Sequence, residues 1–139
     1  MTFEELEDEL PNGFHDMELH GMSLNWVDGS MTMHLNFWTG DLDGPNREEY
    51  TPGMLSITGL CFCSIDPPDP SYQFLPDGSP LNISGDAAES KTFALLEGIT
   101  DKLPPEASCY RFFVHEWNSF IHIAAKNVQL SWTKERVQP

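Results

Sequence analysis

Histidine and carboxylate side chains near the start of the chain are the first candidates for chemistry. His15, Asp16 and His20 lie close together, and His34 follows on the next extended segment. On an extended strand Asp16, Glu18 and His20 point to one side and His15 to the other. Imidazole and carboxylate groups bind several divalent metals, so Asp16, His20 and His34 form one candidate metal site. Their spacing matches no established metal signature, and polar surface histidines are the competing interpretation.

The three cysteines offer a second candidate. Cys61 and Cys63 are two residues apart, which is not the Cys-x-x-Cys spacing of a zinc knuckle, and Cys109 supplies no second pair. Strand alternation places Cys61 and Cys63 on the same face as Leu55, Ile57 and Ile65. We therefore interpret them as small core residues. The odd number of cysteines, without a secretory signal, indicates reduced thiols and a cytoplasmic protein.

An acidic segment and two tryptophans are candidates for binding. Asp41-x-Asp43-Gly44 resembles part of a calcium loop, but its glycine stands at the fourth position instead of the sixth. A solvated acidic turn is the interpretation that we favour. Trp38 is out of phase with Phe37 and is expected on an outer face. Trp117, beside Glu116 in a predicted turn, could anchor a binding surface or fold over the end of the sheet.

Catalytic motifs are missing from the sequence. It contains no Gly-x-Ser-x-Gly motif and no glycine-rich phosphate loop, and Lys and Arg are scarce. We therefore predict a protein that is not an enzyme and that needs no cofactor.

Short extended segments separated by turn signals must position these residues. Asp28-Gly29 predicts a two-residue hairpin turn that pairs Trp26 with Met31 on a buried face, with a bulge near His20-Gly21. Further strands are predicted at 53–65 with a bend at Gly59, at 72–74, 81–83, 109–114, 119–125 and 127–132, whereas 92–96 is ambiguous. Thr2 and Glu5 form a capping box for a short helix over 2–10. We predict a mainly β single domain over 1–139, an antiparallel sandwich or partly open barrel, with an exposed tail at 133–139.

Charge narrows the choice of partners. The chain has 139 residues with 22 Asp and Glu against 7 Lys and Arg, a formal net charge of -15. Residues 1–69 hold 14 of these acids and one base, Arg47, a net of -13. Nucleic acids and anionic membranes attract Lys and Arg, so neither is an expected partner. No apolar run approaches the roughly 18 residues that a membrane-spanning helix needs.

The segment Gly13-Phe14-His15-Asp16-Met17-Glu18-Leu19 resembles the Gly-Phe-His-Asp-Ala-x-Leu opening of a group of uncharacterised bacterial proteins, with Met17 where Ala is usual. Those proteins continue into a hairpin and a strand similar to Leu55–Leu60, and they end in a segment similar to Trp117–Ala125. The Phe-His-Asp opening with its hairpin is also similar, more distantly, to bacterial immunity proteins that neutralise polymorphic toxins. This resemblance implies a toxin domain as partner and provides no catalytic residues.

Together these features predict a non-catalytic interaction module whose acidic face meets a basic protein. The surface candidates are Asp16, Glu18, Trp38, Asp41, Asp43, Glu116 and Trp117. Charge complementarity would speed the encounter, and the aromatic residues would hold the complex. Two alternatives remain open: a small metal-binding protein that uses Asp16, His20 and His34, and a barrel that binds a ligand among its aromatic residues. The oligomeric state does not follow from the sequence.

Overall fold

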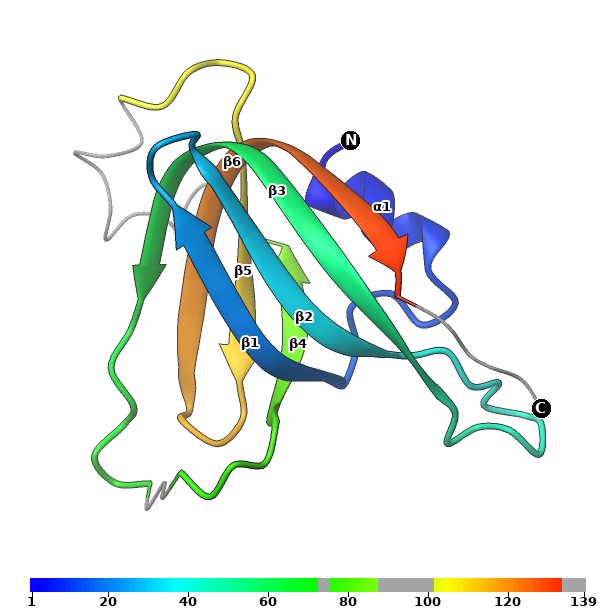
Figure 1. The fold of residues 1–139 in the computed structure, drawn as a ribbon. Coiled ribbons are helices and arrows are strands. Elements are labelled where there is room, and N and C mark those ends of the chain that lie inside the picture. The colour runs from blue at the N-terminus through cyan, green and yellow to red at the C-terminus, as the bar shows by residue number, and fades with distance from the viewer. Residues whose placement is uncertain (73–75, 88–101, 134–139) are drawn as a thin grey trace.

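A computed structural model describes residues 1–72, 76–87 and 102–133. These residues form α1 (Phe3–Glu9), β1 (Met17–Asn25), β2 (Ser30–Trp38), β3 (Tyr50–Ile65), β4 (Leu81–Ala87), β5 (Ser108–Val114) and β6 (Ser119–Trp132). The strands pair in the order β1-β2-β3-β6-β5-β4, all antiparallel, and β4 returns to β1 to close a barrel (Figure 1). The prediction of an antiparallel, mainly β fold with a short N-terminal helix is confirmed, and the barrel is closed.

The hairpin between β1 and β2 has a different register from the predicted one. Asn25 pairs with Ser30 and Leu24 with Met31, so the turn contains four residues, Trp26–Gly29. Trp26 therefore projects from the turn with 65% of its surface exposed, and its predicted core position was wrong. The bulge expected near His20 is present between Leu19 and Gly21.

A bulge in β3 separates the two neighbouring cysteines. Gly59 has φ +62, and the pairing with β6 shifts by one residue between Leu60 and Phe62. A bulge changes the phase of a strand, so Leu60 and Cys63 pack on the core whereas Cys61 does not. The prediction that Cys61 and Cys63 share a core face was wrong for this reason. All three cysteines are free thiols.

Aromatic side chains fill the barrel. Phe14, Phe37, Tyr110 and Phe112 are at most 1% exposed, and Phe3 from α1 stacks on Tyr110 with ring centroids 5.2 Å apart. The described part of the barrel thus has a solid aromatic interior. The alternative in which the barrel binds a ligand stays a prediction.

The other predicted elements divide into three groups. The strand at 81–83 is confirmed within β4, and 109–114 within β5. Segments 119–125 and 127–132 are one continuous strand, β6, and Trp132 at its end is 48% exposed. Tyr72 lies in a turn, while 73–74, 92–96 and 134–139 fall outside the described residues. In the described part of the chain, α1 is far too short to cross a membrane.

A hydrogen bond from a buried phenol connects the core to α1 and gives a testable prediction. The Tyr110 hydroxyl donates to a Glu7 carboxylate oxygen at 2.9 Å. Burial of the hydroxyl and, to a smaller extent, the nearby charge of Glu7 raise the pKa of Tyr110 above its ordinary 10.0. The unfolded phenol therefore ionises before the folded one, and stability falls as pH rises above about 10. We expect Tyr110→Phe to cost about 1 kcal/mol at pH 8 and to flatten the alkaline loss of stability, as measured by urea unfolding at pH 8 and 11.

Tyr72→Phe is the matched control, because it removes the same hydroxyl from an exposed ring and should cost less than about 0.5 kcal/mol at pH 8. Equal alkaline slopes in the wild type and Tyr110→Phe would contradict the prediction.

Candidate functional site

Five side chains from neighbouring segments form what we call the acidic–aromatic face: Asp16, Glu18, Trp38, Glu48 and Tyr50. Strand register brings them together, because Trp38 pairs with Tyr50 and Glu18 lies opposite Asn36 on β2. A surface hollow of about 250 Å³ lies here, lined by Asp16, Trp38, Leu42, Arg47, Glu48 and Tyr50. The predicted candidates Asp16, Glu18 and Trp38 therefore share one face of the barrel.

Asp16 is held in place through its backbone. It adopts φ +50, a left-handed conformation that Asp tolerates better than most residues. Its N–H donates to Ser84 Oγ at 3.1 Å, and its carbonyl accepts from the Tyr50 hydroxyl at 3.1 Å. The carboxylate lies 2.9 Å from His15 Nδ1 and 4.0 Å from His115 Nε2, with about half of the side chain exposed. The fold thus presents this carboxylate at the surface in a fixed orientation.

Trp38 forms a rigid wall of the hollow. Its indole N–H donates to the Arg47 carbonyl at 2.5 Å, and its own carbonyl accepts from the Asn12 amide at 3.0 Å. Gly40 allows the loop after β2 to fold back, because a Cβ there would overlap the Asn46 and Arg47 backbone. The indole is thus held by both its ring nitrogen and its backbone.

The pKa of Tyr50 reports the negative field of the face. Partial burial raises it, and the charges of Glu18, Asp16 and Glu48 raise it further. A phenolate would be repelled by these three carboxylates, so Tyr50 stays a neutral hydrogen-bond donor. The same field favours an incoming cation.

Ser84, His115 and Asp16 meet at one edge of this face without forming a catalytic triad. Ser84 Oγ lies 3.3 Å from His115 Nε2, and Asp16 Oδ1 lies 4.0 Å from the same nitrogen. In a triad the carboxylate orients the opposite ring nitrogen from the one that serves the hydroxyl. Elsewhere, burial raises the pKa of the Cys63 and Cys109 thiols, which keeps these potential nucleophiles protonated.

The candidate metal ligands Asp16, His20 and His34 do not lie close together in the structure. His20 is exposed, and its Nε2 lies 2.9 Å from the same Asn36 amide nitrogen that donates to Glu18. His34 is four residues from Trp38 on β2, about 13 Å along the strand from the level of Asp16. Within the described ranges, no three His, Cys, Asp or Glu side chains lie close enough to hold a metal ion. The metal-site hypothesis is wrong for this trio, because the length of β2 keeps His34 away from the level of Asp16.

The remaining candidates have separate positions. Asp41 and Asp43 are exposed in the loop after β2, where Asp41 Oδ1 accepts the Asp43 N–H at 3.0 Å. Glu116 accepts hydrogen bonds from both the backbone N–H and the side-chain amide of Asn82, at 2.9 and 2.6 Å. Its carboxylate therefore stabilises the contact with β4. Trp117 is half-buried against the core, so it covers the sheet end instead of anchoring a surface.

Comparisons add no family to this geometry. No protein-family model, curated protein or solved structure matches the chain. The site is therefore interpreted from its own residues.

Sequence reasoning missed Tyr50, Glu48 and His115. Tyr50 could have been found, because continuing the 53–65 strand back by three residues places it opposite Trp38. Glu48 stood out only as the last position of the calcium-like segment Asp41-x-Asp43-Gly44-x-Asn46-x-Glu48, and its place on this face depends on a loop. His115 gave no signal, since its position depends on the long-range pairing of β1 with β4.

Proposed function

We propose that the protein is a non-catalytic interaction module that binds a basic protein partner through the acidic–aromatic face. The observation that carries this proposal is the gathering of Asp16 and Glu48 with Trp38 and Tyr50 around one hollow, beside Arg47, with Glu18 near enough for its charge to raise the pKa of Tyr50. Aromatic anchors beside complementary charge are a frequent arrangement at protein interfaces.

The charge of the surrounding chain supports the same proposal. Residues 1–69 carry a net charge of -13, with Arg47 as their single Lys or Arg. Such a field accelerates association with a positively charged partner and repels acidic ones.

The resemblance to bacterial immunity proteins suggests a specific form of the proposal. A toxin domain that acts on nucleic acid needs a basic surface of its own, and an acidic face could cover it. We therefore propose a cytoplasmic toxin domain with a basic active surface as the first partner to test.

Charge removal at the face provides the main test. The triple variant Asp16→Asn, Glu18→Gln and Glu48→Gln keeps the side-chain shapes, and Asn tolerates the left-handed backbone at position 16. We expect it to weaken binding about tenfold, mostly through slower association. Partners captured from a bacterial lysate at 50 and 500 mM NaCl would be identified by mass spectrometry, and their association kinetics would then be measured by surface plasmon resonance.

The matched control is Asp28→Asn, Asp77→Asn and Glu106→Gln, which changes net charge equally at exposed positions outside the face. It should bind nearly as tightly as the wild type. Equal weakening by both triple variants, or binding indifferent to salt, would count against the proposal.

A further inference from the structure

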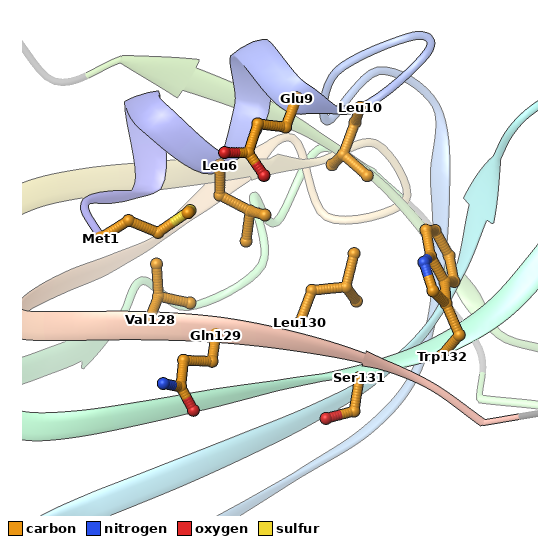
Figure 2. A pocket seen from close by; sticks show the side chains of 9 residues that line it. All are labelled: Met1, Leu6, Glu9, Leu10, Val128, Gln129, Leu130, Ser131 and Trp132. Carbon is orange, nitrogen blue, oxygen red and sulfur yellow. The ribbon is translucent and has the colours of Figure 1, made fainter.

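We propose that the β1–β2 turn of one copy of the chain inserts into an apolar hollow between α1 and β6 of a second copy. The inserting part is what we call the apolar tip: Leu24, Trp26 and Val27. The receiving part, the α1–β6 hollow, has a volume of about 430 Å³, with apolar walls from Leu6, Leu10, Val128 and Leu130 and with Trp132 at one end (Figure 2). The inference does not rest on the acidic–aromatic face.

The apolar tip lies exposed at the end of the first hairpin. Trp26 is 65% exposed, Val27 98% and Leu24 43%. Hairpin turns usually carry Gly, Asn, Asp or Ser, because the turn faces water. Three neighbouring exposed apolar side chains make a contiguous patch, and such patches on soluble proteins mark contact sites.

Hydrogen bonds hold the turn in one shape. The Val27 N–H donates to Asn25 Oδ1 at 3.0 Å. The Gly29 carbonyl accepts from the Leu60 N–H at 2.9 Å, which connects the turn to β3. Because the turn is ordered before any contact forms, inserting it costs little conformational entropy.

The α1–β6 hollow matches the tip in shape and polarity. Leu6 and Leu10 on the helix face Val128 and Leu130 on the strand (Figure 2). The Val128 N–H donates to the Met1 carbonyl at 2.9 Å, so the start of the chain is joined to the strand wall. The volume lies in the range of pockets that bury a group as large as an indole ring. The same chain therefore carries a convex apolar tip and a concave apolar hollow.

The tip that fills the hollow comes from another molecule. Figure 1 shows the β1–β2 turn on one side of the barrel and α1 on the other, so a copy cannot fill its own hollow. Each pairing leaves one tip and one hollow unoccupied, so the contact is head-to-tail and can extend beyond a dimer. The patch is smaller than the roughly 800 Å² per partner of a stable complex, so we expect weak, concentration-dependent association.

The charge of the chain determines how salt affects this contact. Each copy has a formal net charge of -15, so two copies repel each other. Asp28 in the turn and Glu9 in the hollow add to this repulsion. Salt screens the repulsion and should strengthen the association. Binding of a basic partner to the acidic–aromatic face should weaken with salt, so the two proposals can fail separately.

Sedimentation velocity of the full chain between 10 μM and 1 mM, at 50 and 500 mM NaCl, tests the contact. We expect the average mass to rise with concentration, more steeply at 500 mM NaCl. The tip variant, Trp26→Ser with Val27→Ser, and the hollow variant, Leu130→Asn, should each associate at least tenfold more weakly. Their 1:1 mixture should form a dimer and nothing larger, because only one intact tip and one intact hollow can pair.

Two further variants complete the test. Leu42→Ser with Ile65→Ser is the matched control, because it removes two exposed apolar side chains outside both surfaces and should associate like the wild type. Trp132→Ser alters an exposed ring at the end of the hollow. It should weaken association at least threefold, and it tests the hollow even if Leu130→Asn disturbs the fold.

Four outcomes would overturn the inference. These are a monomer at 1 mM in 500 mM NaCl, undiminished association of the tip variant, a 1:1 mixture of folded tip and hollow variants that stays monomeric, and association that weakens with salt. The second outcome would assign self-association to a different surface of the chain.

Discussion

Gly85→Ala is expected to lower the free energy of unfolding by about 3 kcal/mol. Gly85 lies on β4 beneath two core aromatics. A Cβ there would overlap the Tyr110 hydroxyl and lie 2.7 Å from Phe14 Cβ, and the Gly85 N–H donates to the Phe14 carbonyl at 2.7 Å. The added methyl must move either a fully buried ring or the segment that leads into β1. Urea unfolding followed by tryptophan fluorescence would measure the loss.

Two comparisons isolate this steric cause. Gly21→Ala adds the same methyl where nothing lies within 4 Å, so its stability should change by no more than about 0.5 kcal/mol. The double variant Gly85→Ala with Tyr110→Phe removes the nearest overlapping atom. Its loss of unfolding free energy should therefore be smaller than the sum of the losses of the two single variants. Strict additivity would show that the Tyr110 hydroxyl is not the obstacle.

The strands could be predicted from local pattern, whereas their exact phase could not. Asp28-Gly29 correctly predicted the hairpin, but the turn has four residues instead of the predicted two. Trp26 and Val27 therefore lie exposed in the turn, whereas the prediction buried Trp26. The observed register still pairs apolar with apolar residues, Leu24 with Met31 and Met22 with Met33. Since a shift of two residues keeps every side chain on its own face, the alternation alone cannot distinguish the two registers.

The candidate site was partly predictable for a related reason. Asp16, Glu18 and Trp38 belong to one hairpin, so their common face follows from a single pairing. Barrel closure depends on three residue pairs between β1 and β4, which are more than sixty positions apart in the chain. No local signal encodes such a contact, and Ser84 and His115 reach Asp16 only through it.

Phe3→Ala is expected to lower the free energy of unfolding by about 4 kcal/mol. Phe3 is 2% exposed, and its ring centroid lies 5.2 Å from Tyr110 and 5.9 Å from Phe112. An isolated seven-residue helix is not stable in water, so α1 depends on this contact for its position. Differential scanning calorimetry and urea unfolding should both show the loss.

Trp26→Ala is the control for Phe3→Ala, because it removes a larger but 65% exposed ring from the β1–β2 turn and should cost less than about 0.5 kcal/mol. Similar small losses for both variants would mean that α1 is not anchored on the barrel.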